Sequence, residues 1–363
     1  MSEQYQDLQV SEIDMGFGKL GQIVLDKPKA LNALSTVMIE GMQQALDQWR
    51  DDDAVKAIWI EGSGDKAFCA GGDVVTLYHS MKATPSGEIP EKATEFFAKE
   101  YRMDQTIHNY PKPVIVWGDG IVMGGGIGVM AGASHRIVTE RSMLAMPEVT
   151  IGLYPDVGAS WFLNRMPGAC GEFLGMTGAR MKAADALFVK LADYAVTSDN
   201  YEQLRQAISE TDGGHDAIGS VIQQYHSDTG HQDSTLYSHL DRINTLMSPT
   251  NMSDLVAGFE QLDDSDGWLY KSTKALLRGC PMTLFLVREQ IKRAQYMSLS
   301  EVFAMELIMS TQCVLHADLA EGIRALLIEK DNKPQWSVGS VAEITPSMVE
   351  EFFQQPKTPK VSS

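Results

Sequence analysis

Three segments of the chain combine glycines with acidic side chains, and both kinds of residue can do chemistry. They read KAFCAGGD at 66–73, GDGIVMGGGIG at 118–128 and MPEVTIGLYPDVG at 146–158. A glycine lets the backbone come close to a ligand, because it has no side chain in the way. A carboxylate can act as a nucleophile or as a general base. Any one segment alone indicates little, since glycine clusters are most often turns.

The glycines predict a way to stabilise a negatively charged oxygen. Attack on a thioester carbonyl, or enolisation next to it, places negative charge on one oxygen, and two converging N–H groups would stabilise that charge. We predict that Gly72 and Gly125 form this pair. A glycine in the first turn of a helix adds the positive end of the helix dipole. Loss of one such donor typically costs about 3 kcal/mol of transition-state stabilisation.

The elements that must position these residues alternate between strands and helices. We expect strands at 10–15, 21–25, 55–60, 114–117 and 135–139, a short apolar stretch at 143–146, and a helix at 91–110. A further helix should start at Ser35 or Thr36, since its apolar residues recur on one face. That stripe consists of Met38, Met42, Ala45, Leu46 and Trp49. The recurring order of strand, strand and helix predicts an α/β core.

The chain should divide into a core at 1–200 and a mainly helical region at 201–363, which we expect to cover the site or to form an interface. Within that region a polar stretch at 211–239 is interpreted as a surface loop or short helices. The tail beyond Pro356 should be disordered.

Composition excludes several kinds of protein. The 363 residues carry a formal net charge of -18, which argues against a nucleic-acid or anionic-membrane surface. There is no signal-peptide pattern and no apolar run of membrane-spanning length, so we expect a cytoplasmic protein. Neither a disulfide framework nor a metal site is indicated. The spacing of the cysteines and of four histidines fits neither kind of site: Cys69, Cys170, Cys280, Cys313, His215, His226, His231 and His239.

The three segments, together with ALNAL at 30–34, resemble the enoyl-CoA hydratase/isomerase (crotonase) superfamily over about residues 10–200. Within it the chain is most similar to the hydrolase branch. Four stretches carry that similarity: FFAKEY at 96–101, MGGGIG at 123–128, AMPEVTIGLYPDVGAS at 145–160 and EGIRALLIEKD at 321–331. The resemblance implies an α/β fold, a crotonase-like spiral of ββα turns with a helical C-terminal region.

Carried over residue by residue, the resemblance assigns the oxyanion amides to Gly72 and Gly125 and the main catalytic carboxylate to Glu148. Asp156 matches a second acidic residue of the site, and Glu100 matches a substrate-binding position. Glu148 would attack the thioester or activate a water, and both routes stay open. Asp156 would orient substrate or water and assist proton transfer. Four neighbours are expected to contact substrate as well: Ala70, Gly71, Asp73 and Gly124.

The loop that precedes the first helix is the expected position of the nucleotide end of coenzyme A. The resemblance places Lys27, Lys29, Ala30 and Asn32 there, where a lysine could meet phosphate. The alternative is two exposed turn lysines, because lysines are mostly exposed.

Two departures separate the chain from the hydratases of the superfamily. Hydratases carry a first catalytic glutamate just after the glycine triplet, where this chain has Gly128, and usually carry glycine where it has Asp156. Both differences favour hydrolysis over addition of water to a double bond, although a hydratase or isomerase remains an alternative.

Two further classes of protein were weighed. Gly126, Gly128 and Ala131 fit the dinucleotide-binding pattern GxGxxG/A, but the strand expected before them ends at Trp117, too far away for that fingerprint. The second alternative is a non-catalytic scaffold that binds acyl-CoA without turnover, since paired carboxylates can be structural.

The prediction is therefore hydrolysis of a short, branched β-hydroxyacyl-CoA from valine breakdown. No metal or redox cofactor is needed, because coenzyme A is part of the substrate. We expect no nucleic-acid or membrane partner. A homo-oligomer is possible, since trimers are usual in the superfamily.

Overall fold

The computed structural model describes residues 3–85, 87–227 and 229–356, which form two compact parts. The sheet part contains residues 3–72, 102–145 and 181–238, and the helical part contains 73–101, 146–180 and 239–356. This division differs from the expected boundary at residue 200. The segment 146–180 groups with the C-terminal helices because its helix α6 (Cys170–Thr177) packs against α13 (Trp268–Arg278) and α14 (Pro281–Ala294). The expected tail beyond Pro356 lies outside the described residues.

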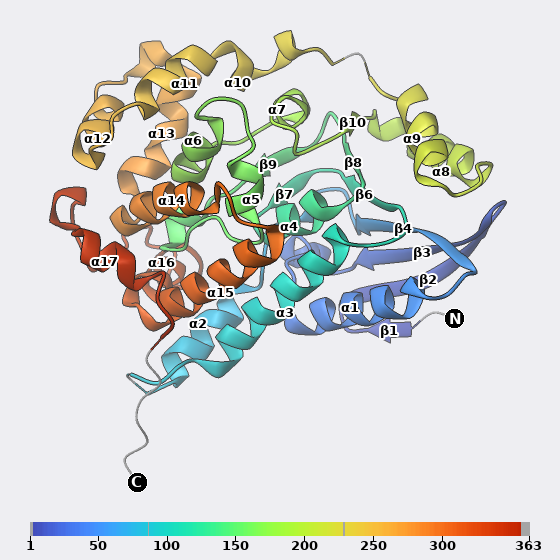
Figure 1. Ribbon diagram of the computed structural model, residues 1–363, viewed down its shortest axis with the longest axis horizontal. Helices are drawn as coiled ribbons and strands as arrows, with labels where there is room; N and C mark the ends of the chain where they lie inside the picture. The colour runs from blue at the N-terminus through green and yellow to red at the C-terminus, as the bar shows by residue number, and fades with distance from the viewer. Residues whose placement is uncertain (1–2, 86, 228, 357–363) are drawn as a thin grey trace. The chain divides into compact units, whose positions relative to one another are not determined.

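The sheet part is built on a large seven-stranded sheet with the strand order β1-β2-β3-β4-β6-β8-β10 (Figure 1). Its strands are β1 (Glu3–Tyr5), β2 (Leu8–Met15), β3 (Gly18–Leu25), β4 (Val55–Gly62), β6 (Val114–Gly118), β8 (His135–Val138) and β10 (Tyr194–Ala195). The first two pairings are antiparallel and the other four are parallel. The five strands expected from the sequence are all present.

A second, smaller sheet is formed by short strands that alternate along the chain with strands of the large sheet. It consists of β5 (Ala67–Cys69), β7 (Ile121–Met123) and β9 (Met143–Ala145), paired in parallel. The long strands β4, β6 and β8 are each followed by one of these short strands. This repetition confirms the predicted spiral of strand, strand and helix, although β5 and β7 were not expected.

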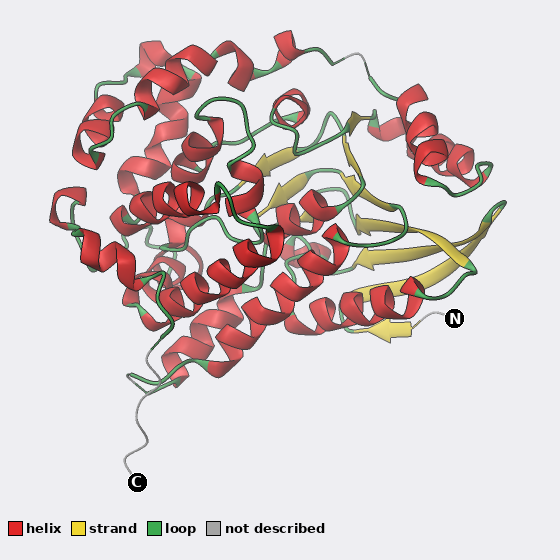
Figure 2. Ribbon diagram, viewed as in Figure 1, coloured by secondary structure: helices red, strands yellow, loops and turns green. Residues whose placement is uncertain are grey.

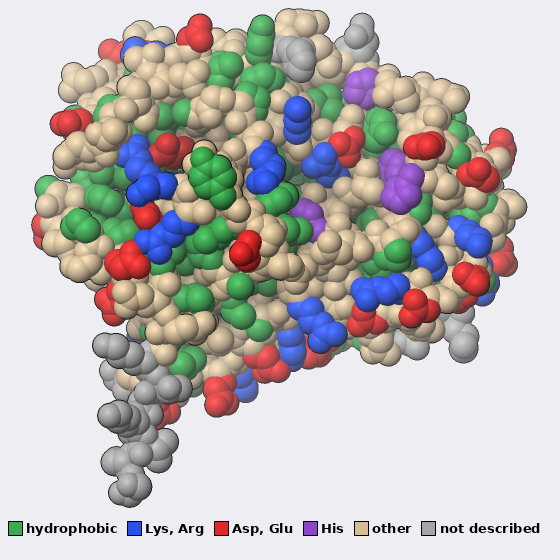
Figure 3. Space-filling model, viewed as in Figure 1, with side chains coloured by type: hydrophobic (Ala, Val, Ile, Leu, Met, Phe, Trp, Pro, Cys, Tyr) green, Lys and Arg blue, Asp and Glu red, His purple; other side chains and the backbone are tan. Residues whose placement is uncertain are grey.

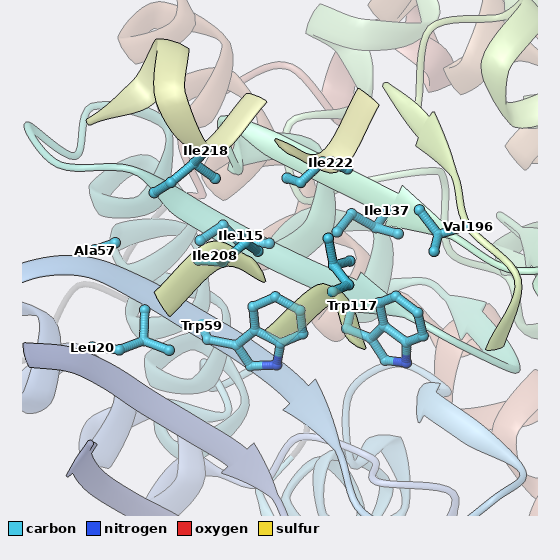
Figure 4. Packing of buried hydrophobic residues seen from close by; sticks show 11 residues of the cluster. Leu20, Ala57, Trp59, Ile115, Trp117, Ile137, Val196, Ile208, Ile218 and Ile222 are labelled. Carbon is cyan, nitrogen blue, oxygen red and sulfur yellow. The ribbon is translucent and has the colours of Figure 1, made fainter. Parts of the chain in front are cut away.

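Helices α8 (Tyr201–Ser209) and α9 (His215–Gln224) cover one face of the large sheet, and their buried side chains meet those of the strands in one cluster (Figure 4). Trp59 and Trp117 stack in it with their ring centroids 6.1 Å apart. Alternate residues of a strand point to opposite faces, so Ile58 and Val116 lie on the other face of the sheet. Strands buried on both faces are typical of a parallel sheet.

Helix α1 (Thr36–Arg50) forms as the sequence predicts. Ser35 caps its start, since its hydroxyl accepts a hydrogen bond from the Met38 amide at 3.3 Å. All five residues of the predicted stripe are buried. The other helices of the sheet part are η1 (Pro28–Ala30), α4 (Gly125–Gly132), α7 (Ala183–Phe188), η3 (Ser198–Asn200), η4 (His231–Asp233) and α10 (Thr235–Ser238).

The helical part contains none of the strands that the structure describes (Figure 2). It contains α2 (Val74–Ala83), η2 (Glu148–Ile151), α5 (Ala159–Leu163), α6, α11 (Leu240–Met247), α12 (Met252–Glu260), η5 (Asp264–Asp266), α13, α14, α15 (Leu299–Leu315), α16 (Ala317–Ile323), η6 (Arg324–Ile328), η7 (Val341–Glu343) and α17 (Pro346–Glu351). Helix α3 (Glu91–His108) starts in this part and runs on into the sheet part. All described elements that begin after residue 200 are helices.

Within the described ranges, no single helix is both long enough and apolar enough to cross a membrane. One pair, Leu299–Leu315 with Ala317–Ile328, meets the length and composition criteria but is bent by 75°. On the face drawn in Figure 3, basic and acidic side chains are interspersed.

Candidate active site

The predicted pair of glycine amides lies in the sheet part, after two neighbouring strands of the small sheet. β5 leads into Gly71 and Gly72, and β7 leads into α4, which begins at Gly125. A Cβ atom at Gly71 would lie 3.9 Å from the Gly125 nitrogen, and one at Gly126 would lie only 2.4 Å from the Cys69 carbonyl oxygen. The two backbone segments are therefore in close contact, and a side chain at Gly126 would force them apart.

Neither predicted oxyanion amide donates a backbone hydrogen bond to the described part of the chain. Gly125 is the first residue of α4, and the first amides of a helix have no partner inside it. Gly124 before it has a φ of 48°, a conformation that favours glycine. Both N–H groups are thus without a backbone acceptor among the described residues, which an oxyanion donor needs. That role itself stays a prediction.

The loop expected near coenzyme A is held against the first of these glycine segments. The Ala70 amide donates to the Leu31 carbonyl at 3.0 Å, and the Leu34 amide donates to the Gly71 carbonyl at 2.8 Å. In this loop Lys29 and Ala30 are exposed.

Asn32 is buried, and its side chain is used inside the fold. Its amide group donates to the carbonyls of Ser63 and Ala67, and its Oδ1 accepts from the Lys27 amide. This side chain therefore shapes the loop. Asp73 has a comparable local role, because its carboxylate accepts from the Thr76 amide and caps α2. Contact of either residue with substrate remains a prediction.

The predicted acidic residues gather in the helical part, where they share one buried cluster. Glu100 of α3 is 2% exposed, Glu148 of η2 is 5% exposed and Asp156 is 4% exposed. Burial raises the pKa of Glu148 well above its usual range, and the charge of Asp156 adds to the effect. Burial, with the charges of Asp156 and Glu148, acts in the same way on the pKa of Glu100. Perturbed carboxyls of this kind are typical of functional sites.

Asp156 is the carboxyl of this cluster that receives a hydrogen bond from another side chain. The Tyr101 hydroxyl donates to its Oδ2 at 2.7 Å and also lies 2.6 Å from the Ser310 hydroxyl. Burial raises the pKa of Asp156 to about 6, while the bond from Tyr101 acts in the opposite direction. A carboxyl with this pKa can exchange a proton near neutral pH.

Two carboxyl oxygens of the cluster stand out. Oε1 of Glu100 and Oε2 of Glu148 are buried and have no hydrogen-bond partner among the described residues. A buried polar atom without a partner is costly, and such atoms in a native fold call for an explanation. A ligand or water that binds to these oxygens would supply one.

Comparison with known proteins gives this geometry a context. The sequence model of the enoyl-CoA hydratase/isomerase family matches residues 20–353. The protein belongs to the enoyl-CoA hydratase/isomerase family. This confirms the resemblance seen in the sequence and extends it over most of the chain.

Named relatives of this enoyl-CoA hydratase/isomerase family member include mitochondrial 3-hydroxyisobutyryl-CoA hydrolases. The chain is 36% identical to that of Gallus gallus, covering 93% of this chain and 87% of the relative. It is 33% identical to that of Homo sapiens, covering 93% and 86%. The matched region therefore spans nearly all of this chain and most of each relative.

Solved structures agree on the fold. A carnitinyl-CoA dehydratase from Mycobacterium thermoresistibile matches with a TM-score of 0.85 and 33% identity, over 96% of this chain and 97% of that one. An enoyl-CoA hydratase from Rhodobacter sphaeroides 2.4.1 matches with a TM-score of 0.84 and 33% identity, over 95% and 97%. The predicted crotonase-like fold of this family member is thus confirmed.

Sequence reasoning missed several polar partners of the acidic cluster. Tyr101, Tyr154, Glu306 and Ser310 are all buried in the helical part and connect to it by hydrogen bonds. A signal for two of them was present, since Glu306 interrupts the apolar stretch 302–309 and Ser310 lies four residues further on, on the same face of the helix.

The strand directly before the glycines is β7, which ends at Met123, and not the strand expected to end at Trp117. Gly126 nevertheless lies inside α4 and not in the turn before it, where the fingerprint places its first glycine. The physical reason for excluding the fingerprint is therefore the start of the helix at Gly125.

The histidines considered as metal ligands differ in exposure. His215 is exposed, and His226 and His239 are half-buried. The side chain of His231 lies outside the described residues. Nowhere in the described part of the chain do three or more His, Cys, Asp or Glu residues form a group that could hold a metal ion.

Proposed function

We propose that this protein hydrolyses an acyl-CoA thioester, and that 3-hydroxyisobutyryl-CoA is its substrate. The observation that supports this most is the buried Glu148 carboxyl, which has one oxygen without a partner among the described residues. The names of the relatives from Gallus gallus and Homo sapiens support the choice of thioester and of acyl group.

In the proposed reaction, the thioester carbonyl oxygen accepts hydrogen bonds from the Gly72 and Gly125 amides. Attack at the carbonyl carbon breaks the C–S bond, and coenzyme A leaves as a thiolate that takes up a proton. If Glu148 attacks, the product is a mixed anhydride, which water then hydrolyses to release the acid. If Glu148 acts as a general base, it takes a proton from the attacking water. The raised pKa of Glu148 makes it a stronger base than an exposed glutamate once it is ionised.

The remaining residues of the proposed site bind and orient. Glu100 would hold the acyl group through its oxygen that has no partner among the described residues, while the ionised Asp156 would orient the attacking water and assist removal of its proton. Lys27 and Lys29 would contact the phosphates of coenzyme A. Neither proposed route for the reaction involves a metal ion or a redox group.

The test is a panel of thioesters followed by release of free thiol. We expect 3-hydroxyisobutyryl-CoA to react faster than 3-hydroxypropionyl-, acetyl- and crotonyl-CoA. Loss of crotonyl absorbance without thiol release would overturn the proposal. Trapping of a glutamyl hydroxamate at position 148 by hydroxylamine would select the nucleophilic route over the general-base route.

A second candidate function is hydration or dehydration of an enoyl-CoA. It is favoured by the names of the two similar structures, an enoyl-CoA hydratase and a carnitinyl-CoA dehydratase, each 33% identical to this chain. Against it stands Gly128, at the position where hydratases carry a glutamate. The crotonyl-CoA arm of the panel separates the two functions.

Location and assembly stay proposals too. A cytoplasmic location was expected from the sequence, whereas the named relatives are mitochondrial. A homo-oligomer would be tested by light scattering of the purified protein.

A further inference from the structure

Glu306 holds the turn that follows Asp156 in the chain. This glutamate lies in α15 and is 0% exposed. Its Oε2 accepts from the Gly158 amide at 2.7 Å, and its Oε1 accepts from the Ser160 amide at 2.9 Å. Both oxygens of its carboxyl are therefore engaged by one turn.

That turn has a backbone which needs support. Val157 has a φ of 53° and Gly158 a φ of 85°, so two successive residues are in the left-handed region. A β-branched residue rarely adopts this conformation, and it persists only where the surroundings hold it. The two hydrogen bonds to Glu306 hold this backbone in place. Asp156 immediately precedes Val157 in the chain.

Helix α15 is also connected to Asp156 through Ser310, one helical turn after Glu306. The Ser310 hydroxyl lies 2.6 Å from the Tyr101 hydroxyl and 2.9 Å from the Tyr154 hydroxyl. Tyr154 donates its proton to the Glu306 main-chain carbonyl at 2.6 Å, and Tyr101 donates to Asp156. Each hydroxyl has one proton to give, so the Ser310 hydroxyl donates to one of the two tyrosines, and Asp156 accepts the proton of Tyr101.

The bonding of Glu306 differs from that of the two glutamates proposed to meet substrate. Glu100 and Glu148 each have an oxygen without a partner among the described residues, whereas both oxygens of Glu306 are bonded to main-chain amides. We propose that Glu306 is a positioning residue, which acts through the 157–160 turn to set the place and the hydrogen bonding of the Asp156 carboxyl. This inference rests on the proposed hydrolysis only for its effect on turnover.

A double-mutant cycle tests whether Glu306 acts through Asp156. Glu306→Gln keeps one acceptor oxygen and places an NH₂ group against the other amide. We expect it to lower kcat for 3-hydroxyisobutyryl-CoA by about 10- to 100-fold, as a misplaced group does, with KM changed less than threefold. In an Asp156→Asn background the same change should lower kcat less than twofold, because the group that it positions has been replaced. An equal loss in both backgrounds, or no loss in either, would overturn the proposal.

Asp185→Asn is the matched control. Asp185 is also buried, and its carboxyl accepts from the Leu236 amide and the Ser234 hydroxyl in the sheet part. Loss of this structural carboxyl should change kcat by the same factor in both backgrounds. Urea unfolding of every variant shows that the comparison is made on folded protein.

A readout without turnover separates this inference from the proposed function. The Asp156 carboxyl is titrated by ¹³C NMR in wild type and in Glu306→Gln, with Asp156→Asn used to assign the signal. The charged or titratable groups that interact with Asp156 are Tyr101, Tyr154, Glu100, Glu148, Glu306 and Cys313. Burial raises the pKa of Glu306 itself to about 8, above that of Asp156.

The expected result is a higher pKa of Asp156 in Glu306→Gln, since the bond from Tyr101 is lost or weakened when the turn moves. An unchanged titration in a folded Glu306→Gln variant would overturn the positioning role, whether or not the enzyme releases thiol. Absence of thiol release by wild type from every thioester tested would instead overturn the proposed function alone.

Discussion

The hydroxyl of Tyr101 lies 2.7 Å from Oδ2 of Asp156 and donates a hydrogen bond to it. This bond favours the ionised carboxylate and opposes the burial that raises the pKa of Asp156 to about 6. Tyr101→Phe removes the donor and keeps the ring. The pKa of Asp156 should then rise, and the acidic limb of the kcat/KM profile should move to higher pH. A pH–rate profile measures this shift.

The matched control for that variant is Tyr110→Phe. Tyr110 is also buried, but its hydroxyl donates to the Leu46 carbonyl. Its loss should leave the acidic limb in place. An unmoved limb in Tyr101→Phe would show that Asp156 does not determine it.

Glu148→Gln should abolish most of the turnover. The change removes a nucleophile or base and keeps the size of the side chain, so kcat should fall by about 10²- to 10⁴-fold with the fold intact. Thiol release and circular dichroism are the measurements. Glu172→Gln is the control, because the carboxyl of Glu172 forms an ion pair with Arg288 at 2.6 Å. Near-normal activity of the Glu148 variant would remove this residue from the mechanism.

Gly126→Ala should separate the two glycine segments. The added Cβ would meet the Cys69 carbonyl at 2.4 Å, and overpacking of this kind typically costs about 1–3 kcal/mol of stability. A shifted oxyanion donor costs about 10²- to 10³-fold in kcat. Gly258→Ala is the control, since its Cβ would meet nothing closer than 3.9 Å. A Gly126 variant with normal kcat would mean that the spacing of these segments does not matter for turnover.

Asp156→Asn should change how stability depends on pH. The folded-state pKa of Asp156 is about 6 against an ordinary value of 3.8, so the folded protein binds this proton more tightly than the unfolded chain. The stabilisation is fully present below about pH 4 and is lost as pH rises through 6.

Asp156→Asn has no carboxyl at this position, so it does not lose this stabilisation as pH rises. Its free energy of unfolding relative to wild type should therefore increase between pH 4 and pH 7. A difference of about two pKa units, at about 1.4 kcal/mol each, predicts an increase of about 3 kcal/mol. Urea unfolding at pH 4, 5, 6 and 7 gives the comparison. Parallel curves for the two proteins would contradict the raised pKa.

Much of the fold could be predicted because its elements are long enough to show a pattern. Five strands have four or more residues, and the stripe of α1 spans three turns. β5 and β7 have three residues each, too few for any period to show. Because β7 was not expected, the strand at 114–117 was taken as the last strand before Gly126.

The candidate site was predictable where chemistry depends on short motifs. Glu148, Asp156 and the glycines stand in contiguous segments. Tyr101 and Glu306 could not be matched to Asp156 and its turn in the same way, because their hydrogen bonds join residues 55 and 148 positions apart in the chain. Such pairs exist only once the helices have packed.

The interleaving of the two parts has a practical consequence. The chain crosses between them after residues 72, 101, 145, 180 and 238, so neither part can be excised as one stretch of polypeptide. A fragment that stops at residue 200 would retain Asp156 but lose the carboxyl that holds its turn. Such a fragment cannot serve as a minimal catalytic unit, and grafting the motif segments onto another scaffold would carry the reacting groups without their support.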